Sequence, residues 1–129
     1  MKLGDIVTLI NGQLLSNDVD LNIDVTYGAA ADLMSDVLAF AKPNAVLLTG
    51  LTNSQVIRTA EMADVTAVVF VRGKRPPADT LKLAKARGIP LVVCAYTMFE
   101  ACGKLYEGGM RGSDPIPTDD LIWLEHPET

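Results

Sequence analysis

The sequence predicts an α/β fold of three layers, in which a mostly parallel sheet carries helices on both faces. Three short apolar runs begin at residues 45, 67 and 91, and segments with helical periodicity lie between them. A strand that is apolar throughout is buried on both sides, and strands that alternate with helices pair in parallel through right-handed crossovers. Aromatic residues make up only 5% of the 129 residues, and aliphatic, β-branched cores suit such sheets.

The N-terminal part predicts one helix and two less buried strands. Apolar residues recur at helical spacing over residues 3–10, and Gly12 is expected to end this helix with a positive φ. Residues 13–15 form a short predicted strand. Apolar and polar residues then alternate over residues 21–26, which predicts a second strand with one solvent-facing side.

The three buried strands are expected over residues 45–49, 67–71 and 91–95. Helices are predicted between them over residues 53–63 and 78–87, because apolar side chains recur there on one helical face. This order of strands and helices is what a parallel sheet requires.

Several residues are typical of helix ends. Asp32 is expected to cap a helix over residues 33–41. Thr52 and Thr97 each begin a Thr-x-x-Gln/Glu capping box. Gly88 is followed by Ile-Pro and is expected to end the preceding helix, because glycine adopts the left-handed conformation and proline cannot continue a helix.

The charge distribution excludes some partners. The net charge is −5: residues 1–107 carry 10 basic and 11 acidic side chains, and residues 108–129 carry one basic and five acidic. Nucleic-acid binding through a broad basic face is therefore not expected. No apolar run approaches the roughly 20 residues that span a bilayer, and the first residues lack the apolar region of a signal peptide. We expect a cytoplasmic protein with no membrane partner.

The composition changes near residue 108, which divides the chain into a body, residues 1–108, and an acidic extension, residues 109–129. Glycine, serine and proline make the first part of the extension a linker. Its apolar segment 121–124 contains the only tryptophan, so we expect the extension to dock on the body or on a partner.

The residues that carry chemistry do not form a catalytic group. Cys94 and Cys102 lack metal-ligand spacing and are expected to be reduced, partly buried thiols. The only histidine, His126, lies in the extension, so a Cys–His pair would require that segment to fold back. No P-loop and no Ser-His-Asp set is present. We expect no catalytic residue, no metal and no cofactor.

A binding site is expected beyond the carboxyl ends of the parallel strands, where ligands bind in such sheets. Helix N-termini and cations there would favour an anion. The residues in question have simpler explanations too: the threonines as helix caps, the glycines as turn residues and the basic residues as a solvated loop. The candidate ligand-binding residues are Thr49, Gly50, Thr52, Asn53, Arg72, Gly73, Lys74, Arg75 and Thr97.

Five segments together resemble a stand-alone DRTGG domain: residues 32–40, 47–53, 69–76, 88–90 and 96–100. The resemblance covers about the first 108 residues, and this family is similar to the N-terminal domain of HPr kinase/phosphorylase. DRTGG domains also occur within some phosphotransacetylases and beside CBS domains in some pyrophosphatases. The resemblance implies an HPr kinase N-terminal-like fold and an accessory, regulatory or dimer-forming role.

The chain departs from the family pattern at two strand ends. Relatives often carry Gly-Asp-Arg where this chain has Gly50-Leu51-Thr52, and Leu-Thr-Gly-Gly where it has Val71-Arg72-Gly73-Lys74. Positive charge has thus moved from one strand end to the next.

These observations favour a non-catalytic regulatory module, a homodimer that senses a small anionic ligand, nucleotide or phosphorylated, or that mediates interaction with a partner enzyme or signalling protein. One alternative is a small phosphoryl- or acyl-transfer enzyme that holds an anion with Thr52, Lys74 and Arg75 and uses Asp32 as its base. The other is a purely structural adaptor whose contact is the acidic extension.

Overall fold

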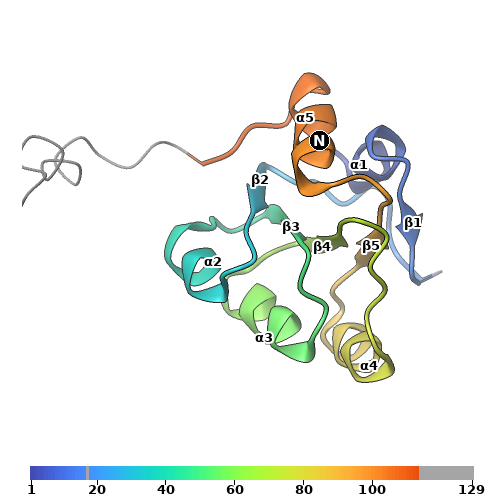
Figure 1. Cartoon of the computed structure of the whole chain (residues 1–129), viewed down its shortest axis with the longest axis vertical. Coiled ribbons are helices and arrows are strands. Elements are labelled where there is room, and N and C mark those ends of the chain that lie inside the picture. The colour runs from blue at the N-terminus through green and yellow to red at the C-terminus, as the bar shows by residue number, and fades with distance from the viewer. Residues whose placement is uncertain (17, 114–129) are drawn as a thin grey trace, which may run out of the picture.

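Five strands form one sheet in the order β1-β5-β4-β3-β2 in the computed structural model, which describes residues 1–16 and 18–113 (Figure 1). The strands are β1 (Gln13–Leu14), β2 (Tyr27–Ala30), β3 (Ala45–Thr49), β4 (Ala67–Phe70) and β5 (Leu91–Val93). The helices are α1 (Leu3–Leu9), α2 (Met34–Phe40), α3 (Ser54–Met62), α4 (Ala78–Arg87) and α5 (Met98–Glu107).

The sheet is mostly parallel, as predicted. Strands β2, β3, β4 and β5 are parallel neighbours, and only β1 runs antiparallel, beside β5. The four parallel strands are adjacent in both sequence and space, so their carboxyl ends meet at one edge of the sheet. That edge is where the sequence predicts a site.

Helices cover both faces, which confirms the three-layer prediction (Figure 1). One core cluster joins α1 and α5 to the side chains on one face of the sheet, including Val46 and Leu48. The other joins α2, α3 and α4 to the opposite face, including Leu47 and Phe70. Because the central strands are buried on both faces, their apolar runs are continuous.

The predicted strand over residues 21–26 is wrong. The segment makes one isolated bridge, between Lys2 and Asp24, and its carbonyls serve α1 instead. Leu3 N donates to Ile23 O and Gly4 N donates to Leu21 O, both at 2.9 Å. The segment therefore satisfies the first N–H groups of a helix, which have no partner within it. The edge strand beside β3 is β2, whose Tyr-Gly-Ala-Ala sequence does not predict a strand.

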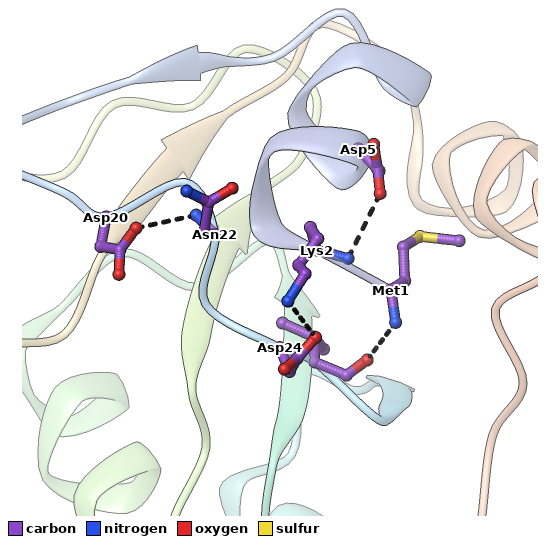
Figure 2. A network of polar contacts seen from close by, with 7 residues as sticks. Met1, Lys2, Asp5, Asp20, Asn22 and Asp24 are labelled. Carbon is purple, nitrogen blue, oxygen red and sulfur yellow. Dashed lines mark hydrogen bonds and ion pairs between the residues drawn. The ribbon is translucent and has the colours of Figure 1, made fainter.

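Figure 2 shows how the same segment is fastened to the N-terminus. The Met1 ammonium donates to Val25 O at 2.9 Å, and Lys2 Nζ lies 2.8 Å from the Asp24 carboxylate. The hydrogen bond and the charge of Lys2 lower the pKa of Asp24. Asp5 accepts a hydrogen bond from Lys2 N. The start of α1 is therefore stabilised both by a contact within its first turn and by contacts with residues 24 and 25.

The predicted ends of two helices are confirmed. Thr97 caps α5 by accepting a hydrogen bond from Glu100 N at 3.3 Å. Gly88 ends α4 in the left-handed conformation, with φ +69°.

Three other expected helix-end residues are displaced by one position. Gly12 is not left-handed, and it lies against β5, where a Cβ would come within 2.6 Å of Val92. Asp32 does not cap α2, since its carboxylate is bonded elsewhere. The residues found at these ends are Asn11 with φ +50°, Leu33 as the N-cap of α2 in place of Asp32, and Asn53 as the N-cap of α3 in place of Thr52.

The packed body continues past residue 108. Met110 is buried in the core beside α5, and Arg111 O accepts a hydrogen bond from Gly28 N of β2 at 2.9 Å. The predicted docking of the extension through residues 121–124 lies outside the described residues.

Candidate functional site

Three strand ends are joined at the carboxyl edge of the sheet. Val71 N donates to Thr49 O at 3.1 Å, which joins the turns that follow β4 and β3. Arg72 N donates to Tyr96 O at 2.7 Å, which joins the turns that follow β4 and β5. The edge therefore brings together backbone that is far apart in the sequence, as the parallel topology predicts.

The turn after β4 has an unusual backbone. Arg72 and Gly73 are both left-handed, with φ +59° and +66°, and Lys74 N closes the turn by donating to Val71 O at 3.2 Å. Two positive φ values in succession are characteristic of a type I′ turn. A left-handed conformation costs a residue other than glycine about 1–2 kcal/mol. Hydrogen bonds to the end of β5 offset that cost, including Gly73 N to Cys94 O at 2.7 Å.

Four residues form what we call the Gly50 cluster: Asp32, Thr49, Gly50 and Arg72. The Nη2 atom of Arg72 lies 2.9 Å from the position that a Cβ at Gly50 would occupy, and the Asp32 carboxylate oxygens lie 3.5 and 3.6 Å from it. Asp32 Oδ1 accepts hydrogen bonds from Thr49 Oγ1 at 3.0 Å and from Gly50 N at 2.7 Å. A guanidinium and a carboxylate thus both face the Cα of Gly50.

The role of Asp32 is missing from the sequence prediction, which treats it as a helix cap or as a base for the enzyme alternative. The signal that could have found it is its position, since Asp32 follows a strand at the same edge as Thr49 and Arg72. That signal depends on β2, which the sequence does not predict as a strand.

Two further candidates lie on the α3 side of the sheet. Thr52 does not cap α3, and its carbonyl accepts a hydrogen bond from Thr80 Oγ1 of α4 at 2.8 Å. Asn53 is the cap, because its side chain accepts from Gln55 N at 3.1 Å. The first turn of α3 therefore begins directly after the Gly50 cluster.

The remaining candidates diverge. Arg75 donates to Gln13 Oε1 of β1 at 2.9 Å, on the other side of β5 from Gly50. Lys74 is exposed, and its side chain makes no hydrogen bond or ion pair with a residue that the structure describes. Thr97 begins α5, which covers the face opposite to α3. The predicted basic cluster is thus divided, and Arg72 alone faces Gly50.

The principal cavities of residues 1–16 and 18–113 lie away from this cluster. The largest of the four, of about 730 Å³, lies between α4 and a segment that includes residues 15–16 and 18–20, near the amino end of β5. A smaller one of about 160 Å³ lies under α5 beside β2 and is lined in part by Cys102. The Gly50 cluster lines none of the four principal cavities.

The two cysteines are free thiols, Cys94 buried and Cys102 half-buried. Burial raises the pKa of both, so each favours its protonated form. Within the described part of the chain, no three His, Cys, Asp or Glu side chains are grouped as metal ligands. His126 lies outside that part. None of the described helices combines the length and apolar character needed to cross a membrane.

Comparison with known proteins identifies the fold. No protein-family model and no curated protein matches the sequence. Among solved structures, the chain is similar to the CBS and DRTGG domains of the regulatory region of Clostridium perfringens pyrophosphatase, crystallised with its activator diadenosine tetraphosphate. The TM-score is 0.64 at 14% sequence identity, over 79% of this chain and 44% of that chain. The present chain therefore matches less than half of that regulatory region, and it shares with it a mixed α/β fold.

Proposed function

We propose that this protein is a non-catalytic regulatory module, a homodimer that binds a small anionic ligand, nucleotide or phosphorylated, at the carboxyl edge of its sheet. The observation that carries the proposal is the placement of Arg72. A strained backbone holds this residue so that its guanidinium lies against buried Gly50, and the guanidinium donates no hydrogen bond to a described residue. It is therefore available to an anion.

The surroundings of Arg72 suit a phosphate group. Guanidinium groups bind phosphate through two parallel hydrogen bonds, and the first turn of α3 supplies N–H groups and the positive end of a helix dipole. Lys74, exposed on the same turn as Arg72, adds a second positive charge. Of the candidates, Arg75 and Thr97 contribute least, because they lie toward β1 and the opposite face.

The fold comparison supports the class of function and of ligand. The similar solved structure is a regulatory region bound to a dinucleoside polyphosphate. The segments that resemble DRTGG domains, and through them the N-terminal domain of HPr kinase/phosphorylase, imply the same accessory role. Homodimer formation is consistent with large apolar side chains exposed beside β2: Leu33, Leu38 and Phe40.

The geometry supports binding over phosphoryl or acyl transfer. Thr49 and Asp32 form a hydroxyl–carboxylate pair, which is the arrangement of a nucleophile and its base. The Thr49 side chain is fully buried, however, and its hydroxyl is bonded to Asp32. A substrate would have to displace Asp32 to reach that hydroxyl, and the displaced carboxylate could no longer act as its base. The adaptor alternative depends on the acidic extension beyond the described residues.

The proposal is tested by thermal unfolding of the full chain with inorganic phosphate, ATP or diadenosine tetraphosphate. A probe at 100 times its Kd is expected to raise the free energy of unfolding by about 2.7 kcal/mol. Arg72→Ala should abolish the effect. Gly50→Ala should do so with the charge retained, because the added Cβ displaces the flexible end of Arg72.

Arg87→Ala is the matched control, since Arg87 is equally charged and exposed, pairs with Glu61, and lies at the opposite edge. The proposal is wrong if no probe stabilises the wild type, or if Arg72→Ala and Arg87→Ala respond alike.

The homodimer is tested separately by analytical ultracentrifugation of the full chain. Sedimentation should give the mass of two chains, and a mass of one chain would exclude the dimer.

A further inference from the structure

Two donors of the Gly50 cluster already hold an anion, the carboxylate of Asp32. We define the anion seat as the Thr49 hydroxyl, the Gly50 amide and the Arg72 guanidinium. Asp32 Oδ1 accepts hydrogen bonds from the Thr49 hydroxyl at 3.0 Å and from the Gly50 amide at 2.7 Å. The Asp32 carboxylate and the Arg72 guanidinium both lie close to the Cβ position of Gly50. A phosphate oxygen would seek the same donors, because carboxylate and phosphate are both oxyanion acceptors.

Asp32 stands directly before a weakly anchored helix. Of the seven residues of α2, only Val37 is buried, whereas α3 buries four of its nine residues. The α2 N-cap, Leu33, makes no capping hydrogen bond with its side chain. The polar links between the start of α2 and β3 are the Asp32 carboxylate and one backbone hydrogen bond, from Ala31 N to Leu48 O at 3.1 Å. Met34, the first residue of α2, adds partly buried packing against the core.

We propose that Asp32 competes with the ligand for the anion seat, so that ligand binding releases the start of α2 from the sheet. This inference rests on the proposed function and adds its means of regulation. Each of the two N–H or O–H donors carries one hydrogen, so a ligand oxygen that takes both must displace Asp32 Oδ1. The release moves the exposed apolar side chains of α2, Leu38 and Phe40, and thereby changes the surface that a partner meets.

The coupling between the seat and α2 works in both directions. Whatever binds α2 in its present position strengthens the hold of Asp32 on the seat and weakens ligand binding by the same factor. A second copy or another partner on α2 and an anion on Arg72 are thus expected to weaken each other's binding, which is the behaviour of a sensor.

The test measures the affinity of the full chain for inorganic phosphate, ATP and diadenosine tetraphosphate by calorimetry. Asp32→Ala empties the seat and is expected to bind the probes at least tenfold more tightly than Asp36→Ala. Asp36→Ala is the matched control, because it also removes one negative charge, in the first turn of α2, and leaves the groups of the anion seat unchanged. Asp32→Asn keeps an acceptor oxygen and the side-chain shape. It should bind with intermediate affinity, and it keeps the test decisive if the alanine variant does not fold.

Hydrogen exchange supplies the second readout. Amides of α2 should exchange faster in Asp32→Ala than in the wild type. A probe should accelerate the exchange of α2 amides in the wild type and accelerate none of the amides of α3. If the probes bind through Arg72 but Asp32 and Asp36 variants have equal affinity, the competition is refuted and the proposed function stands. If no probe binds the wild type, the proposed function fails as well.

Discussion

Arg72 is the residue at which backbone preference and tertiary structure disagree. Four non-glycine residues in the described part have a positive φ, and three of them are Asn11, Asn44 and Asp64. Asn and Asp tolerate this conformation because their short polar side chains bond locally, whereas arginine has no such preference. Backbone strain of this kind is common where a functional side chain must be held in one orientation, so the strain at Arg72 supports the proposed anion site.

Removing the arginine should therefore reveal the strain. We expect Arg72→Gly to be more stable than Arg72→Ala by about 1 kcal/mol, because glycine adopts φ +59° without a steric penalty and alanine does not. Urea denaturation of the two variants gives the difference directly. Equal stabilities would mean that the turn relaxes, and the strain argument would then fail.

The cysteines predict a pH effect. Burial raises the pKa of Cys94 and Cys102, so between the ordinary thiol pKa, about 8.5, and the raised value the unfolded chain releases protons that the folded chain keeps. The free energy of unfolding should therefore fall as the pH rises above about 8.5. The double variant Cys94→Ala/Cys102→Ala should lose less stability between pH 7.5 and 9.5 in urea denaturation. The same loss in both proteins would contradict the effect of burial.

Among the elements, two glycines show how backbone conformation alone can mark the end of a helix. Helix α4 ends at Gly88 in the left-handed conformation, and α5 contains Gly103 in its interior. A Cβ at either position would meet no atom within 4 Å, so only backbone preference distinguishes the two sites.

This pair of glycines gives opposite predictions for one substitution. Gly88→Ala should destabilise the protein by about 1 kcal/mol, because alanine resists the left-handed conformation. Gly103→Ala should stabilise it by up to about 1 kcal/mol, because alanine has the higher helix propensity. Thermal unfolding measures both changes. A shift of the same sign in the two variants would contradict the assigned helix boundaries.

At the scale of the whole molecule, the body extends further along the chain than the composition suggests. Beyond residue 108, Met110 is 5% exposed and fills the core under α5, and Arg111 O closes the edge of β2. The segment after α5 is thus part of the packed structure. Its glycine-rich composition does not predict this, because only one apolar side chain and one carbonyl attach the segment to the body.

Truncation distinguishes the two boundaries. A chain ending at Gly108 should be less stable than one ending at Ser113 by about 2–4 kcal/mol, since it loses the buried Met110 side chain and leaves a cavity. Urea denaturation of the two truncated chains provides the comparison. Equal stabilities would place the end of the body at residue 108, as the composition predicts.

The central layers of this protein follow from patterns in its sequence. Apolar runs and helical periodicity are repeated patterns, and they predicted β3, β4, β5, the helices between them and, through parallel pairing, the edge at which a site should lie. Such patterns are reliable because each depends on burial averaged over many side chains.

Which residues meet at that edge depends on tertiary contacts that the patterns do not contain. The Tyr-Gly-Ala-Ala strand β2 forms because β3 offers it hydrogen-bond partners, and residues 21–26 serve α1 because its first N–H groups need acceptors. Asp32, Gly50 and Arg72 come together because of where single side chains point after these elements have packed. A hydrogen bond between distant residues leaves no period in the sequence, and this is the physical reason that the fold was readable from it and the Gly50 cluster was not.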